Sequence, residues 1–121
     1  MRLLYVLIAI PVLSAAQNVA PTAFPEGSTA LASDSLRERL GGKVFSVKPV
    51  SDPEIRIQYQ GDFAFVNIGN ASDSGKWRVE GSSVCNDWRS FRPSCSDVRL
   101  LGDVMYIKRA NNGEVIAMQP K

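Results

Sequence analysis

The stretch EIRIQYQGDFAFVNI, residues 54–68, carries the clearest structural pattern in the chain. In its first half Ile55, Ile57 and Tyr59 alternate with polar residues, which is the period of a strand with one buried face. The Gly-Asp pair that follows predicts a turn, and the mostly apolar run FAFVNI predicts a second, central strand. The fold therefore starts from a β-hairpin.

Similar short stretches recur along the rest of the chain at spacings of about ten residues. They are KVFSV, KWRVE, SVCNDW, DVRLL, VMYIKR and EVIAM. Turn-forming residues separate them, among them the Asn112-Gly113 pair and the loop expected at residues 69–75, GNASDSG. In KWRVE, Trp77 and Val79 are expected to point inward.

No segment between these stretches is long enough to form a crossover helix. We therefore predict an all-β domain over residues 33–121, an antiparallel meander of about eight short strands that closes into a small up-and-down barrel. A β-sandwich is the alternative.

Three segments precede these strands. Residues 1–16, MRLLYVLIAIPVLSAA, have the charge, the apolar run and the small residues of a secretory signal peptide. Residues 17–32, rich in Pro, Ala, Ser and Thr, predict a flexible leader. The segment SDSLRERLGG predicts a short helix with Ser33 or Ser35 as its N-cap and Gly41 as its stop.

The chain has two cysteines, Cys85 and Cys95, separated by nine residues. In an exported chain such a pair is expected to form a disulfide, since metal and redox motifs use closer spacings. Closing this loop of about 11 residues stabilises a domain by roughly 3 kcal/mol. The sequence thus predicts a periplasmic or secreted protein, with no membrane span after the signal peptide.

Composition argues against several classes of function. The 14 Lys and Arg residues against 12 Asp and Glu give a net charge of +2, which offers no electrostatic basis for a nucleic-acid partner. The absence of histidine removes Ser-His-Asp and Cys-His nucleophiles and most catalytic zinc sites. The remaining carboxylate pairs, Asp52 with Glu54 and Asp73 with Asp87, lie beside predicted turns, where such groups are usually solvated. We therefore expect no enzyme, no cofactor and no metal site.

The loop between the cysteines is the best candidate for a binding surface. It holds Trp88, Arg89, Phe91 and Arg92, and Trp and Arg are the side chains most enriched at interface hot spots. A disulfide lowers the entropic cost of presenting them. Trp88 is also compatible with a core position, whereas the two arginines are expected to be exposed.

The barrel interior is a second candidate, because eight strands leave a space that side chains fill or that holds one small ligand. If one end is open, the residues expected to line it are Tyr59, Phe63, Trp77 and Tyr106. Our leading expectation is a non-enzymatic module that engages a protein partner through the cysteine loop, as an inhibitor or an envelope accessory. The alternative is a carrier of a small apolar ligand.

The segments SGKWRVEG (74–81) and CNDW (85–88), followed by a second cysteine before a strand, also form a recognisable order. It resembles a group of small exported bacterial proteins of unassigned function with a G-x-W, C-x-x-W and partner-cysteine pattern. The resemblance implies that the matching positions have structural roles: Gly75, Trp77, Gly81, Cys85, Trp88 and Cys95. The G-x-W strand opening is similar to lipocalin-like barrels and to small barrel inhibitors of secreted proteases, which implies binding at the level of the fold alone.

Overall fold

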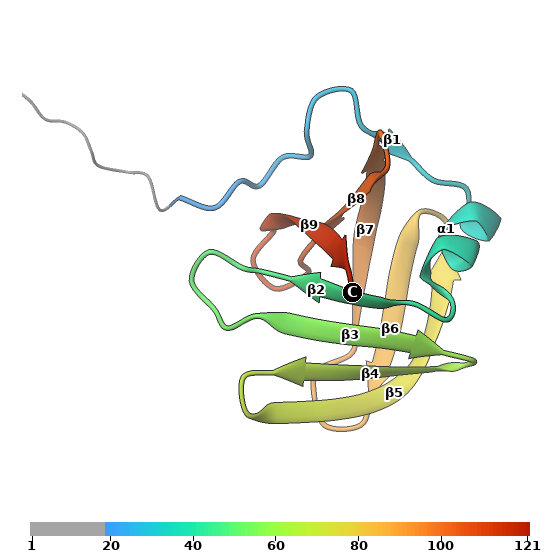
Figure 1. The fold of residues 1–121 in the computed structure, drawn as a ribbon, viewed down its shortest axis with the longest axis vertical. Helices are drawn as coiled ribbons and strands as arrows, with labels where there is room; N and C mark the ends of the chain where they lie inside the picture. The colour runs from blue at the N-terminus through green and yellow to red at the C-terminus, as the bar shows by residue number, and fades with distance from the viewer. Residues whose placement is uncertain (1–18) are drawn as a thin grey trace, which may run out of the picture.

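Eight antiparallel strands form a closed ring in which each strand pairs with the next one along the chain (Figure 1). They are β2 (Val44–Val47), β3 (Ile55–Gln60), β4 (Phe63–Ile68), β5 (Ala71–Glu80), β6 (Ser83–Trp88), β7 (Ser94–Leu101), β8 (Val104–Lys108) and β9 (Val115–Pro120). The ring closes where β9 returns to pair with β2. The predicted up-and-down barrel is confirmed, and the sandwich alternative is not formed.

The computed structural model describes residues 19–121, so the signal peptide predicted for residues 1–16 lies outside the described part. Within that part, no helix is long and apolar enough to cross a membrane.

The helix α1 (Ser33–Leu40) covers one end of the ring (Figure 1). Leu36 and Leu40, four residues apart on one face, are fully buried in the core. Burying each leucine contributes about 1.5–3 kcal/mol to stability. The Ser33 hydroxyl donates to the carbonyl of Gly81 in the β5–β6 turn at 2.8 Å, which fixes α1 to that end.

Both helix ends differ from the prediction. Ala32 is the N-cap, and its methyl side chain has no atom that could form a capping hydrogen bond. The Ser33 hydroxyl bonds to the Gly81 carbonyl and so holds α1 to the barrel. At the other end Gly41 keeps a negative φ of −59°, and Gly42, with φ at 74°, takes the left-handed conformation.

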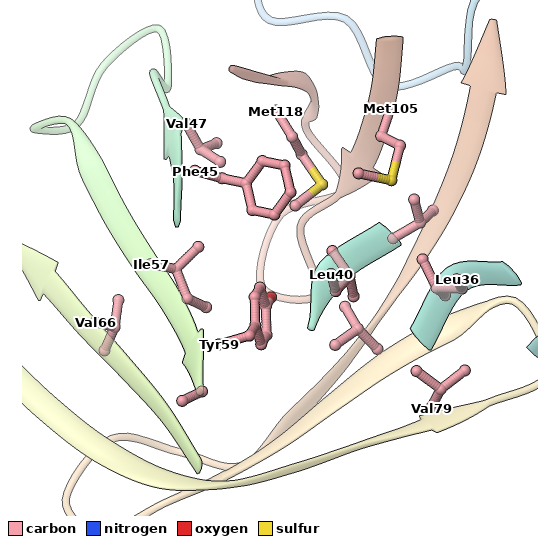
Figure 2. Close-up of a cluster of buried hydrophobic side chains, with 13 residues drawn as sticks. Leu36, Leu40, Phe45, Val47, Ile57, Tyr59, Val66, Val79, Met105 and Met118 are labelled. Atoms are coloured by element: carbon pink, nitrogen blue, oxygen red, sulfur yellow. The ribbon is translucent and has the colours of Figure 1, made fainter. Parts of the chain in front are cut away.

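The core fills the half of the barrel next to α1. Figure 2 shows Phe45, Tyr59, Leu40 and Met118 pointing into one common space. The ring of Tyr59 contacts those of Phe45 and Trp77, with centroids 6.3 and 4.8 Å away. These three aromatic side chains are thus grouped toward the helix-covered end.

Residues 69–75, predicted to be a loop, mostly belong to β5. Only Gly69 and Asn70 form the β4–β5 turn, and the residues after them pair with β4. Polar residues such as Ser72 and Ser74 give the stretch the composition of a loop. They lie on the outer face, opposite exposed residues of β4, where polar side chains are compatible with a strand.

The segment before α1 lies against the barrel, although its composition predicts a flexible leader. The short strand β1 (Thr29–Ala30) pairs with β7, and the guanidinium of Arg99 lies 5.2 Å from the ring centre of Phe24. The Pro21 carbonyl accepts a hydrogen bond of 2.8 Å from the first residue of β9. These partners come from distant parts of the chain, so local composition does not reveal them.

Gly75 allows the closest approach between two strands. It lies opposite Trp88 in the β5–β6 pair, and a Cβ there would overlap the Asp87 carbonyl oxygen and lie 2.8 Å from the Trp88 Cα. Gly75→Ala is therefore expected to lower the free energy of unfolding by about 3 kcal/mol, measured by urea denaturation.

Gly102→Ala is the matched control for this prediction. Gly102 has φ at 61°, and a Cβ added to it would meet nothing within 4 Å, so only backbone strain of about 1–2 kcal/mol is expected. A loss at Gly75 no larger than the loss at Gly102 would contradict the close approach of the strands.

Candidate ligand-binding site

The end of the barrel opposite α1 is open, and four loops surround it. In an up-and-down barrel alternate connections lie at the same end. The connections at the helix end are the turns 61–62, 81–82 and 102–103. Those at the open end, here called the mouth, are the loops 48–54, 69–70, 89–93 and 109–114 (Figure 1). The disulfide-closed loop is therefore part of the rim of the mouth.

A cavity of about 550 Å³ opens at the mouth and extends into the barrel. This volume lies in the range of about 300–1,000 Å³ that is typical of small-molecule sites. Its wall on β2, β3 and β4 is hydrocarbon apart from the hydroxyl of the one tyrosine: Val47, Ile55, Ile57, Tyr59, Val66 and Ile68. Ile107, Met118, Trp88 and Phe91 add further apolar surface.

The wall on β6 and β7 is more polar. Asn86, Ser94 and Ser96 line the cavity there, and Asn86 lies directly opposite Ser94 in the strand pair. Asn86 is only 7% exposed, and within residues 19–121 its Oδ1 has no hydrogen-bond partner. An unpaired buried polar atom of this kind costs about 1–3 kcal/mol. The cavity thus combines an apolar wall with a polar strip.

The predicted disulfide is confirmed. Cys85 and Cys95 lie directly opposite each other in the β6–β7 pair and are bonded, which closes the loop 89–93 at its base. In the described part of the chain, the one cluster with metal-ligand spacing consists of these two sulfurs and the Glu80 carboxylate. Because the sulfurs are joined to each other, neither is a thiolate ligand.

A carboxylate fixes the same loop from the neighbouring strand. Asp73 of β5 accepts hydrogen bonds from the backbone N–H groups of Ser90 and Phe91, both at 2.8 Å, and from that of Ser74. The bond from Phe91 is the main cause that lowers the pKa of Asp73, and desolvation opposes it. The loop is thereby held with Phe91 half-buried against the core.

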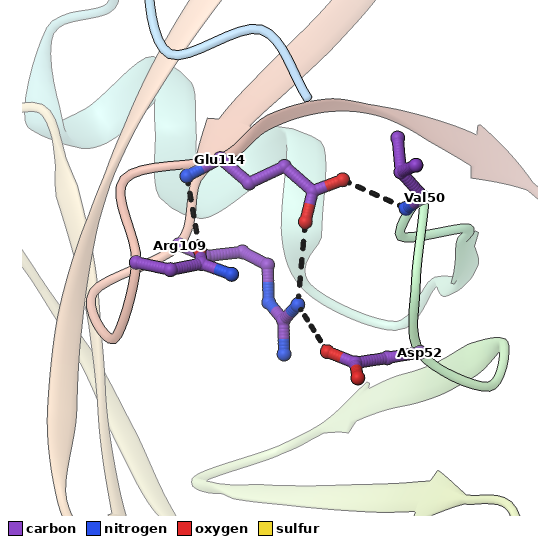
Figure 3. Close-up of polar contacts among 5 residues, drawn as sticks. Val50, Asp52, Arg109 and Glu114 are labelled. Atoms are coloured by element: carbon purple, nitrogen blue, oxygen red, sulfur yellow. Dashed lines mark hydrogen bonds and ion pairs between the residues drawn. The ribbon is translucent and has the colours of Figure 1, made fainter. Parts of the chain in front are cut away.

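Arg109 ties two other rim loops together (Figure 3). Its guanidinium donates to Asp52 at 2.9 Å and to Glu114 at 3.4 Å. Glu114 is 4% exposed, and its second carboxylate oxygen accepts the N–H of Val50 at 2.8 Å. Since Arg109 also lines the cavity, this network forms part of the rim.

Four of the residues predicted to be functional lie on the cavity wall: Tyr59, Trp88, Phe91 and Arg92. Trp77 packs against Tyr59 toward the helix end, where its Nε1–H donates to the Gly61 carbonyl at 2.9 Å, and it does not line the cavity. Arg89 borders a second, polar hollow on the outer surface beside Asp73.

Two predicted cavity residues are on the outer face instead. Phe63 is 47% exposed, because Ala64 and Val66 take the inward positions of β4. Tyr106 alternates with Met105 and Ile107, which pack on the core. The prediction that these two rings line the cavity is therefore wrong, because strand periodicity places them outside.

The predicted carboxylate pairs have separate partners. Asp52 binds Arg109, and Glu54 accepts a bond from the Ser46 hydroxyl, which is the main cause that lowers its pKa. Asp73 is engaged by backbone amides, while Asp87 is on the outer face in an ion pair of 3.0 Å with an arginine.

Sequence reasoning missed Asn86, although the signal was present. In SVCNDW, Val84, Asn86 and Trp88 share one face, and Val84 is fully buried. An asparagine between two inward apolar residues marks a polar group directed into the barrel.

Comparisons of the chain with protein-family models, with curated proteins and with solved structures gave no match. The resemblance to small exported bacterial proteins and to lipocalin-like barrels stays a prediction. The function must therefore be inferred from the cavity and its rim.

The lowered pKa of Asp73 predicts a pH-dependent loop. Because the folded-state pKa lies below that of the free side chain, the ionised carboxylate stabilises the loop at neutral pH. This contribution is expected to be lost as the pH falls from about 4, the ordinary value for Asp, through the lowered folded value. Asp73→Asn should be less stable than wild type at pH about 7, with a smaller difference at pH about 2.5.

Urea unfolding at both pH values checks this, together with trypsin cleavage after Arg89, which should be faster in Asp73→Asn at neutral pH. Asp103→Asn, in the turn at the helix end, is the matched control. A stability difference that is the same at both pH values would contradict the role given to the Asp73 charge.

Proposed function

We propose that this protein is a non-enzymatic binding module that carries one small, mostly apolar ligand in the mouth cavity. The open apolar cavity of about 550 Å³ is the observation that supports this most directly. Such a volume corresponds to about 18 water molecules at about 30 Å³ each. Most of its wall offers them no hydrogen bonds, so their replacement by an apolar molecule is favourable.

The cysteine loop also supports the carrier function, because it forms part of the cavity wall. Trp88 and Phe91 are half-buried and pack against the core, and Arg92 lines the mouth beside them. An interface built on these two aromatic rings would need them to face outward. The small-ligand alternative from the sequence therefore receives more support than the protein-partner function that we expected first.

We also infer that the protein works in an oxidising compartment outside the cytoplasm, as the predicted signal peptide suggests. The disulfide between Cys85 and Cys95 supports this, because such bonds are rare in reducing compartments. Neither a nucleic-acid partner nor a membrane anchor is part of the proposal.

A second candidate function is favoured by the two arginines of the loop. Arg89 and Arg92 are exposed, and within residues 19–121 neither forms an ion pair. Guanidinium groups held on a disulfide-closed loop suit a protein partner with carboxylates. Binding of a partner to this surface would not depend on whether the cavity holds a ligand.

The carrier function predicts that filling the mouth abolishes binding. Ile107→Trp places a larger side chain in the cavity and is expected to weaken binding of the neutral fluorescent probe N-phenyl-1-naphthylamine by at least about tenfold. Fluorescence titration measures this. Leu101→Trp, outside the cavity lining near the helix end, is the size-matched control. Equal binding by wild type and Ile107→Trp would exclude the cavity as the site.

The partner function predicts the opposite pattern. A complex cross-linked to the wild-type protein in its native exported fraction should disappear in the double variant Arg89→Ala/Arg92→Ala and persist in Ile107→Trp. Probe binding by the single variant Arg89→Ala should change by less than about twofold, since Arg89 does not line the cavity. If the complex survives removal of both arginines, the loop is not the interface.

A further inference from the structure

We infer that the ligand carries a hydroxyl group on an otherwise apolar body and that this hydroxyl hydrogen-bonds to Asn86 inside the barrel. The inference rests on the proposed carrier function and deepens it, because it names the chemical class of the ligand: an apolar alcohol or phenol.

Asn86 is placed where a ligand would meet it. It lines the cavity, is only 7% exposed, and leaves Oδ1 without a partner among the described residues. Its registered neighbours on the same face are Trp77 of β5 and Ser94 of β7. Trp77 is packed against Tyr59 and has its indole N–H bonded to Gly61, so it does not supply a donor to Asn86.

The position favours a specific polar role over a packing role. Val84 and Trp88 flank Asn86 on the inward face of β6, and an aliphatic residue between them would fill the space without an unpaired polar atom. The Asn86 amide instead lies at the border between the packed core and the cavity. A ligand group that pairs with it would remove the cost of its burial in the bound state.

A hydroxyl fits this amide better than other small polar groups. It donates one hydrogen bond and accepts others, so it can pair with the Oδ1 acceptor and also with the side-chain N–H donors. The hydroxyls of Ser94 and Ser96 extend the polar strip along β7 and offer further partners. On the facing wall the strands β3 and β4 present Ile55, Ile57 and Ile68, which match a hydrocarbon body.

Two probes of nearly equal shape test the inference. 4-Hexylphenol carries the hydroxyl, and 4-hexyltoluene has a methyl group in its place. Both are titrated by displacement of N-phenyl-1-naphthylamine from wild type and from Asn86→Leu. The ratio of the phenol affinity to the toluene affinity is expected to be about tenfold higher in wild type than in the variant, which corresponds to about 1.4 kcal/mol of coupling.

Asn67→Leu is the matched control, because Asn67 is exposed on the outer face of β4 and its substitution should leave the wild-type ratio unchanged. Thermal unfolding is recorded first, and Asn86→Val replaces Asn86→Leu if the larger side chain prevents folding.

The outcomes separate this inference from the carrier function. If both probes displace the dye and their affinity ratio is the same in wild type and in the Asn86 variant, the cavity binds ligands but Asn86 does not select a hydroxyl, and the inference is overturned alone. If wild type binds neither the dye nor the probes, the carrier function fails and the inference fails with it.

Discussion

The pairing of β2 with β9 closes the ring of strands, and this closure determines how much space lies between them. An eight-stranded barrel has an almost fixed diameter, so the side chains that point inward either fill it or leave it open. Near α1 the interior receives Phe45, Tyr59 and Trp77, together with two leucines from the helix. Toward the mouth the wall on β2, β3 and β4 is made mainly of Val and Ile, and no helix covers that end in the described part of the chain. The cavity therefore follows from how side-chain volume is distributed along the strands.

The mouth keeps its shape because its loops are fixed by bonds of different kinds. The disulfide closes one loop covalently, and Asp73 binds two backbone amides of the same loop. The network of Arg109 and Glu114 connects the other two long loops, and the burial of Glu114 keeps that contact away from solvent. A rim held in this way loses little conformational freedom when a ligand enters, which is the condition for useful affinity from a small contact area.

The sequence predicted the strands well, because alternation in a half-buried strand is a local property. The bounds of β4 and the inward direction of Ile55, Ile57 and Tyr59 follow from it directly. The pairing of β1 with β7 could not be predicted, since two residues carry no periodicity.

Errors in the site arose where residue type was given more weight than position. Phe63 and Tyr106 are aromatic residues predicted to line the cavity, yet their neighbours in the strand occupy the inward face. Asn86 is not among the predicted cavity residues, yet its place between Val84 and Trp88 directs it inward. In a closed barrel, the parity of a residue along its strand is a better guide to its direction than its hydrophobicity.

One row of residues that pair across neighbouring strands relates the packing of the barrel to its cavity. Across four neighbouring strands the row runs Tyr59, Ala64, Gly75 and Trp88, with the two largest side chains at its ends and the two smallest between them. Gly75 cannot carry a side chain, because the β6 backbone lies too close to it. Ala64 is fully buried beside it, so the middle of the row adds almost no volume to the interior. Tyr59 and Trp88, at the two ends of the row, line the cavity, whereas Ala64 and Gly75 between them do not. The close approach of β5 to β6 thus leaves the volume of this row to its two aromatic residues, which form part of the site.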